Sequence, residues 1–172
     1  METWFKDGWK YRDYDLPVCT HYHSNGNKKE EQWDIHIFNN GNGRGNNLPN
    51  IIGYYENGNR KYECWYLKGK LCRHQGPAVI SYYENGLKSY ETWYVEDRLE
   101  CWGGRSPSLV EYYSNGNIKE ECWCKRDRFH RYEKDLEYGY NREGDKYLPA
   151  RITYFENGAL KNEELWLYGQ RL

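Results

Sequence analysis

Short runs of alternating apolar and polar residues recur along the chain on both sides of Asn-Gly pairs. Around Asn57, for example, Ile51–Tyr55 precede the pair and Arg60–Trp65 follow it. Strand side chains alternate between the two faces of a sheet, and Asn-Gly between two such runs is the strongest local signal for a β-hairpin. We therefore predict five antiparallel hairpins with type I′ turns, whose glycines are Gly26, Gly58, Gly86, Gly116 and Gly158.

The hairpins belong to a sequence repeat. All five prolines stand eight residues before the Asn of an Asn-Gly pair, with a Tyr three residues before that Asn and a Glu six residues after it. A Trp eight residues after the Asn completes four copies, and Leu165 takes its place in the fifth. We expect structural roles for these markers, which include Tyr54, Tyr82, Tyr112, Tyr154, Trp33, Trp65, Trp93 and Trp123, together with Trp4 of an initial half copy.

These markers divide the chain into about five and a half copies. We expect a single repeat domain over 1–172, with a half repeat at 1–16 and repeats at 17–48, 49–76, 77–106, 107–148 and 149–172. Isolated hairpins are marginal, so neighbouring copies must stack. The predicted fold class is all-β, an elongated single-sheet array of antiparallel β-hairpins.

Pairing outward from the Asn57 turn predicts which residues share a face. It places Ile52 opposite Glu63 and Tyr54 opposite Lys61, on the same side as Trp65. We expect this aromatic face to hold the copies together, with the Glu row paired to a basic row formed by Lys29, Lys61, Lys119 and Lys161. One Glu in every copy favours such a structural ladder over acid-base catalysis, so we expect no catalytic residue and no enzyme.

The unit Tyr-Tyr-Glu-Asn-Gly followed by Trp-Tyr-x-x-Gly, as in Tyr54–Gly69, resembles the MORN repeat. It is most similar to the variant in YwqK-type bacterial antitoxins and in tandem-repeat proteins of large DNA viruses. The resemblance implies scaffolding, self-association and phospholipid contact. It suggests a structural component of a virion or virus factory that binds protein partners, as a homodimer or larger assembly. Antitoxin-like inhibition is an alternative, as is recognition of a glycan or a phospholipid headgroup by the aromatic face.

Charge and hydropathy narrow these choices. The 25 basic and 26 acidic residues nearly cancel, which argues against nucleic acid as a partner. No apolar run approaches the roughly 18 residues of a membrane-spanning helix, and Met1–Lys10 lacks the features of a secretory signal. We expect a cytoplasmic protein that is neither secreted nor transmembrane.

Two groups of residues depart from the repeat. Cys19, His21 and His23 alternate along one predicted strand and carry zinc-binding side chains, with His36 as the one candidate for a fourth ligand. The spacing of alternate strand residues is loose for a compact metal site, so we favour a divergent end copy over a metal site. We predict no cofactor. Some aromatic residues lie outside the repeated positions and are candidate partner contacts: Trp9, Trp102, Tyr138 and Tyr140. The alternative is that these residues cap or cover the edges of the sheet.

Overall fold

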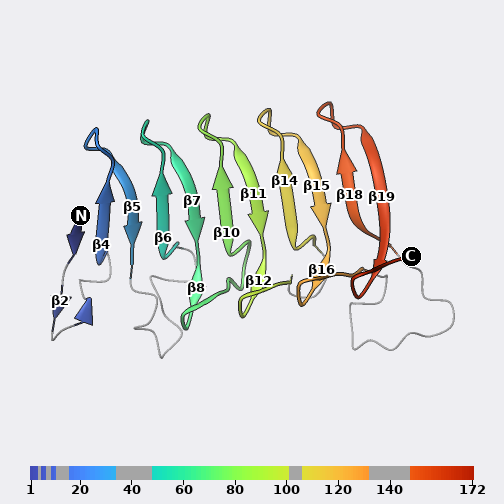
Figure 1. The fold of residues 1–172 in the computed structure, drawn as a ribbon, viewed down its shortest axis with the longest axis horizontal. Helices are drawn as coiled ribbons and strands as arrows, with labels where there is room; N and C mark the ends of the chain where they lie inside the picture. The colour runs from blue at the N-terminus through green and yellow to red at the C-terminus, as the bar shows by residue number, and fades with distance from the viewer. Residues whose placement is uncertain (4, 7–8, 11–15, 34–47, 101–105, 132–147) are drawn as a thin grey trace.

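The computed structural model describes residues 1–3, 5–6, 9–10, 16–33, 48–100, 106–131 and 148–172. Within these residues the protein is all-β, with no helix. Twelve strands form one open antiparallel sheet in the order β1-β4-β5-β6-β7-β10-β11-β14-β15-β18-β19-β20. Five long hairpins stand side by side in a row, with their Asn-Gly turns at the same end (Figure 1). The predicted fold class is confirmed.

The strands of the large sheet are β1 (Glu2–Thr3), β4 (Cys19–Tyr22), β5 (Lys28–Gln32), β6 (Ile51–Tyr54), β7 (Arg60–Cys64), β10 (Val79–Tyr82), β11 (Lys88–Thr92), β14 (Leu109–Tyr112), β15 (Ile118–Cys122), β18 (Pro149–Tyr154), β19 (Leu160–Leu167) and β20 (Gln170–Arg171). Small two-stranded hairpins form at the opposite end from the Asn-Gly turns: β2 (Phe5–Lys6) with β3 (Trp9–Lys10), β8 (Tyr66–Leu67) with β9 (Lys70–Leu71), β12 (Tyr94–Val95) with β13 (Arg98–Leu99), and β16 (Cys124–Lys125) with β17 (Arg128–Phe129).

The Asn-Gly turns differ from the predicted type. Only the glycine has positive φ, at +87° in Gly58. The N–H of Gly58 donates to the carbonyl of Tyr55 at 3.0 Å, and the N–H of Tyr55 donates to the carbonyl of Asn59 at 2.9 Å. This is a type I turn followed by a left-handed glycine in a bulge, the usual three-residue hairpin loop. The type I′ prediction was wrong because Asn-Gly fits both loops.

Two consecutive residues with positive φ, as a type I′ turn requires, occur instead in the small hairpins. They are Lys68-Gly69, Glu96-Asp97, Arg126-Asp127 and Tyr168-Gly169. The first three of these loops each join two strands of two residues, and Tyr168-Gly169 joins the end of the long strand β19 to β20. The small hairpins also connect to each other, since the N–H of Asp97 donates to the Leu71 carbonyl at 3.1 Å and the Leu71 N–H donates to Oδ1 of Asp97 at 2.6 Å.

The predicted register holds near the middle of each hairpin and shifts by one residue toward the turn. Ile52 pairs with Glu63 as expected, but Tyr54 pairs with Arg60 and not with Lys61. A bulge at Lys61 turns its ammonium toward the other face, 5.4 Å from the centre of the Tyr55 ring. The bulge recurs in all five long hairpins.

The bulge changes which basic residues join the Glu row. The partners are Lys28 for Glu31, Arg60 for Glu63 and Lys88 for Glu91, at 2.7, 2.5 and 2.6 Å. The predicted pairing with Lys29, Lys61, Lys119 and Lys161 was therefore wrong. We call the face that carries Ile52, Tyr54, Glu63, Trp65 and their equivalents the ladder face, and the opposite one the variable face.

Tyr hydroxyls of the ladder face connect successive repeats. Each donates to the Glu of the preceding repeat, as Tyr82 does to Glu63 at 2.5 Å. The same bond joins Tyr54 to Glu31, Tyr112 to Glu91 and Tyr154 to Glu121, at 2.6, 2.5 and 2.7 Å. The Tyr–Glu pairs therefore recur from repeat to repeat along the ladder face.

The Trp markers of the ladder face lie in its thin core. Trp33, Trp65 and Trp123 are buried, with 5–6% of their surface exposed, whereas Trp93 is half-buried. The Arg73 guanidinium lies 3.9 Å from the centre of the Trp65 ring and thereby covers it. Trp4 lies outside the described residues.

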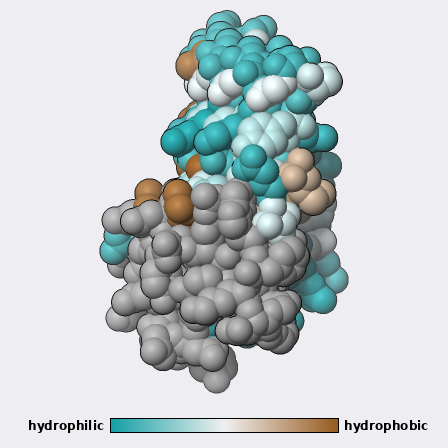
Figure 2. Space-filling model, turned by 90° about the vertical axis from the view of Figure 1, so that its left-hand side faces the viewer, coloured by the Kyte–Doolittle hydropathy of each residue, from teal (hydrophilic) through white to brown (hydrophobic). Residues whose placement is uncertain are grey.

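The turn ends form a second set of links between repeats. The hydroxyl of Tyr55 donates to the carbonyl of Tyr82 in the next repeat at 2.7 Å, and the amide of Asn59 donates to the carbonyl of Glu84 at 2.8 Å. Tyr83 and Tyr113 repeat the first contact. Seen from the N-terminal edge of the sheet, the turn end is mostly hydrophilic (Figure 2).

Candidate binding face

Strand register aligns equivalent residues into rows that cross the sheet at right angles to the strands. On the ladder face one row alternates Glu with an aliphatic or Thr side chain across ten strands. Its members are Thr20, Glu31, Ile52, Glu63, Ile80, Glu91, Val110, Glu121, Ile152 and Glu163. This regularity is what stacking requires, because each repeat meets its neighbours through the same contacts.

The variable face lacks this regularity. We call its middle row the central row: His21, Glu30, Gly53, Tyr62, Ser81, Tyr90, Glu111, Glu120, Thr153 and Asn162. No residue type recurs at a fixed interval along this row. The side chains that distinguish one repeat from the next are therefore gathered in one line on one face.

Tyr62 lies flat on the sheet at the centre of this row. A Cβ on the neighbouring Gly53 would overlap the Tyr62 ring, so the ring occupies the space above the glycine. Its hydroxyl donates to Oε2 of Glu30 on the far side of that glycine. Burial, followed by this hydrogen bond, raises the pKa of the Tyr62 phenol. The ring is thus fixed with one face against the backbone.

Tyr90 is the next aromatic residue of the row, two strands further along. Its side chain is 45% exposed and makes no hydrogen bond or ring contact with the rest of the described chain. Ser81 lies between the two rings in the row, and no charged residue of the row separates them.

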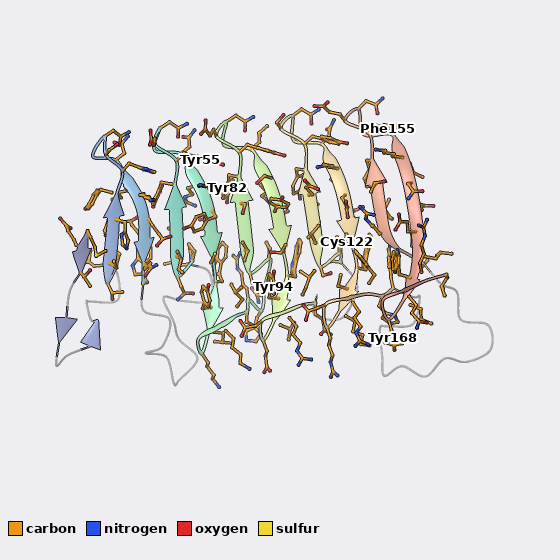
Figure 3. All side chains as sticks on the ribbon, in the orientation of Figure 1. Tyr55, Tyr82, Tyr94, Cys122, Phe155 and Tyr168 are labelled. Atoms are coloured by element: carbon orange, nitrogen blue, oxygen red, sulfur yellow. The ribbon has the colours of Figure 1, made fainter. Side chains whose placement is uncertain are left out.

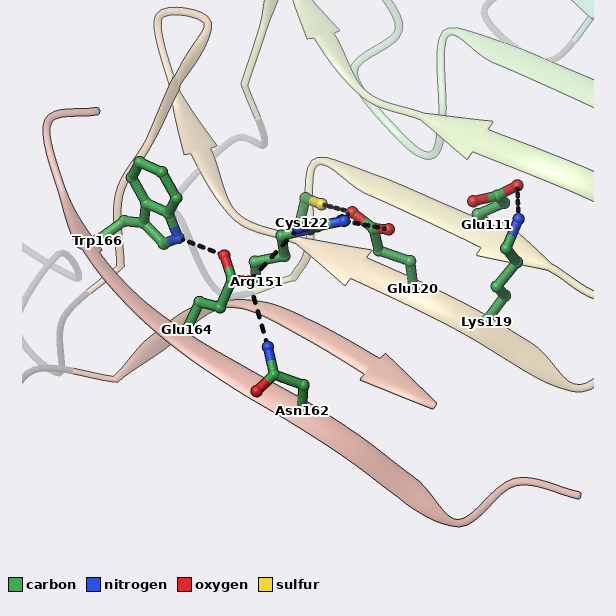
Figure 4. Close-up of polar contacts among 8 residues, drawn as sticks. All are labelled: Glu111, Lys119, Glu120, Cys122, Arg151, Asn162, Glu164 and Trp166. Atoms are coloured by element: carbon green, nitrogen blue, oxygen red, sulfur yellow. Dashed lines mark hydrogen bonds and ion pairs between the residues drawn. The ribbon is translucent and has the colours of Figure 1, made fainter. Parts of the chain in front are cut away.

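A polar pocket of about 450 Å³ opens at the C-terminal end of the row. Arg151 lies at its centre and bonds both oxygens of Glu120, from Nε at 2.8 Å and from Nη2 at 3.1 Å (Figure 4). Glu164 approaches the same guanidinium at 3.5 Å. The full lining is Tyr113, Lys119, Glu120, Arg151, Thr153, Tyr154, Lys161, Asn162 and Glu164.

The ionisable groups here compensate one another. The hydrogen bond from Arg151 lowers the pKa of Glu120, and the same bond raises the pKa of Arg151. Lys119 bonds Glu111 at 2.7 Å. Burial raises the pKa of the Cys122 thiol, which donates to Glu120 at 3.0 Å. The lowered pKa favours the carboxylate form of Glu120, and the raised pKa favours the neutral thiol of Cys122, which is the less nucleophilic form.

The three zinc-binding side chains that the sequence places on one strand do not converge. Cys19 and His21 are neighbours, with Sγ 3.2 Å from Nε2. His23, however, occupies the slot of Tyr55 in its repeat, and its Nε2 lies 3.0 Å from the carbonyl oxygen of Tyr54. Among the described residues no three His, Cys, Asp or Glu side chains form a metal-binding group, and His36 lies outside them.

The predicted partner contacts fall largely outside the described residues. Trp102, Tyr138 and Tyr140 are not described, and of Trp9 only the backbone is placed, in β3. Sequence reasoning missed Tyr62, Tyr90 and Arg151. The available signal for the two Tyr residues was variation among copies: the residue before the marker Glu is Glu, Tyr, Tyr, Glu and Asn in successive copies, while the marker Glu does not vary.

Comparison with protein-family models and with curated proteins found no match to the chain. By its architecture the protein is a β-hairpin repeat array, in which Tyr–Glu pairs recur from repeat to repeat. Among the described residues no helix is present that could span a membrane.

Proposed function

We propose that the protein is a non-enzymatic interaction scaffold. The observation that carries this proposal is the difference between the two faces. The ladder face repeats its contacts and holds the array together, while the central row of the variable face carries a different pair of residues in each repeat. A long sheet of this kind offers an extended surface on which successive repeats can present their side chains.

The MORN-like character of the repeat supports the same proposal. Arrays of this kind are associated with scaffolding, and the resemblance to tandem-repeat proteins of large DNA viruses makes a virion or virus factory in the host cytoplasm the setting that we propose. Immunodetection in purified particles and in infected-cell fractions tests this setting, and recovery of the protein from neither would contradict it.

We further propose self-association through the C-terminal edge of the sheet. Strand β19 is the longest strand, and β20 pairs only with its end, at Trp166 and Leu167. Leu160, at the other end of β19, is 54% exposed, and Phe155 at the start of the preceding turn is 50% exposed. Among the described residues no other strand pairs with the rest of this edge, and an edge of this kind that carries apolar side chains favours pairing with a second copy.

Light scattering coupled to size-exclusion chromatography tests this association. We expect the wild-type protein to form dimers and Leu160→Lys to shift the equilibrium toward monomer, because a lysine on the edge opposes strand pairing. Leu172→Lys is the matched control, since Leu172 is equally exposed, at 59%, but lies outside the strands. A wild-type protein that is monomeric at all concentrations would refute the proposal.

A further inference from the structure

We propose that the central row is a binding site for a neutral, linear oligosaccharide that lies across the strands, from the Tyr62 ring to the polar pocket around Arg151. This goes beyond the scaffold proposal and does not depend on it. The ladder face is unsuited to this role, because its Trp side chains are buried and its Tyr hydroxyls are engaged by Glu.

The Tyr62 ring has the orientation that stacking on a sugar ring requires. It lies over Gly53, so its free face points away from the sheet. The bond to Glu30 fixes it there, which removes the entropy that a mobile side chain would lose on binding. Gly53 is thus a positioning residue, since only the absence of a Cβ leaves space for the ring.

Tyr90 supplies the second aromatic contact. It stands two strands from Tyr62, a distance of about 10 Å at the usual strand spacing. That distance is comparable to the length of a disaccharide in an extended β-linked chain. A polymer that follows the row would therefore present equivalent sugar faces to both rings, with the Ser81 hydroxyl between them.

The polar end of the row provides hydrogen bonds for hydroxyl groups. Glu120, Thr153 and Asn162 follow one another on adjacent strands at the pocket. Ion pairing to Arg151 holds Glu120 in place while its remaining acceptor capacity stays available. The pocket's three cations are balanced by three carboxylates: Lys119, Arg151 and Lys161 against Glu120, Glu164 and the adjoining Glu111. The pocket therefore has no net charge that would favour an anionic sugar.

A glycan fits this surface better than a flat protein partner does. A protein interface would remove water from the Arg151–Glu120 and Lys119–Glu111 pairs, which is costly for charges that are already paired. Sugar hydroxyls can instead replace the water molecules around these groups one for one. The site is also narrow, since it follows a single line of residues.

Affinity electrophoresis tests the proposal, with gels that contain soluble β-linked glucan, xylan or glucomannan. Calorimetry then measures the affinity for hexasaccharides of β-1,4-linked glucose, xylose and N-acetylglucosamine. We expect retention by at least one neutral polymer and a loss in affinity of about tenfold in Tyr90→Ala, as for a central aromatic contact. Tyr22→Ala is the matched control, because Tyr22 is 40% exposed but lies on the ladder face, and it should bind as wild type does.

Gly53→Ala gives a second test of the geometry. The added methyl group would displace the Tyr62 ring, so binding should weaken about as much as in Tyr90→Ala while the circular dichroism spectrum stays that of the wild type. Absence of retention by every neutral polymer, retention by anionic heparin alone, or equal binding by wild type and Tyr90→Ala would each overturn the proposal. Dimerisation in light scattering is a separate readout, so the scaffold proposal can fail or hold independently.

Discussion

Buried carboxylates are the most costly residues of this fold, and each is stabilised by two partners. Glu63 is 4% exposed, accepts a bond from Arg60 of its own strand and accepts another from the Tyr82 hydroxyl of the next repeat. A buried charge without such partners would be strongly destabilising. Each buried Glu therefore needs the Tyr hydroxyl of the following repeat as a hydrogen-bond donor. This need explains why a Tyr and a Glu occur together in every copy.

We predict that Tyr82→Phe destabilises the protein by about 1–3 kcal/mol, because it leaves a buried carboxylate with one partner fewer. Urea denaturation followed by circular dichroism measures the change. Tyr22→Phe is the control, since the Tyr22 hydroxyl contacts Glu2 at 3.4 Å in an exposed position, and its cost should be below about 0.5 kcal/mol. Equal costs for both variants would show that the ladder does not contribute to stability.

At the scale of elements, each repeat uses two turns with different conformational demands. The Asn-Gly turn needs a left-handed residue only at Gly58 and its equivalents. The type I′ turn of the small hairpin needs two, and at Arg126-Asp127 both are non-glycine residues, with φ of +51° and +67°. Asp127 offsets this strain because its Oδ1 accepts the Leu99 N–H of the preceding repeat at 2.7 Å.

We therefore predict opposite effects at the two turns. Gly58→Ala should cost about 1–2 kcal/mol, because a Cβ is disfavoured at φ +87° even in open space. Arg126→Asn should stabilise the protein by up to about 1 kcal/mol, since Asn tolerates the left-handed region better than Arg does. Thermal and urea unfolding of the two variants measure these changes, and a destabilising Arg126→Asn would contradict this assignment of strain.

The last repeat lacks two groups with which the inner repeats contact their successors. Phe155 stands where Tyr55, Tyr83 and Tyr113 carry the hydroxyl that reaches the next carbonyl (Figure 3). Ala159 likewise stands where Asn59 and Asn117 carry a bridging amide. The 149–172 repeat is thus poorly suited to accept a further repeat of the same kind, and a second copy should pair with it by another geometry.

The same comparison gives a test of the turn-end links. Tyr83→Phe should cost about 0.5–1.5 kcal/mol, because it removes a hydrogen bond to the Tyr112 carbonyl. Phe155→Tyr restores the hydroxyl in the last repeat, where no described carbonyl follows, and should leave the unfolding midpoint unchanged. Stabilisation by Phe155→Tyr as large as the loss in Tyr83→Phe would show that the hydroxyl acts without a following repeat.

At the scale of the whole molecule, the Tyr–Glu hydrogen bond is repeated along the array. The contributions of these bonds to the pH dependence of stability therefore add up. Burial, followed by the bond to Glu121, raises the pKa of Tyr154 to about 12, and burial with bonds to Glu63 and Glu91 raises the pKa values of Tyr82 and Tyr112 as well. A phenol whose pKa is raised on folding contributes stability that is complete below the unfolded value of about 10 and is lost as the pH rises above it.

We predict that the free energy of unfolding falls steeply between pH about 10 and about 12. Urea denaturation at closely spaced pH values measures the slope. Tyr154→Phe should reduce the slope, because the variant has one titrating phenol fewer, whereas Tyr22→Phe should leave it as in wild type. A slope that is the same in all three proteins would mean that lysine deprotonation alone causes the loss.

Local chemistry made much of this fold predictable. Asn-Gly pairs, prolines and alternating side chains fixed the number and place of the hairpins, since each signal acts over fewer than ten residues. The burial of Trp33, Trp65 and Trp123 and the pairing of Ile52 with Glu63 followed from the same pattern. The bulge at Lys61 did not, because it depends on how the turn and the twist of the two strands fit together.

The amino-acid sequence by itself determined that this chain is a row of hairpins, because turn conformation and strand alternation are local properties. Only the tertiary structure decided that Tyr62, Tyr90, Glu120 and Asn162 lie in one line, since these residues are 28 or more positions apart and meet through the stacking of repeats. It also decided that Arg60 joins the Glu63 ladder and that Lys61 leaves it. A single bulged residue reverses the face of a side chain, and no local signal in the sequence marks where that happens.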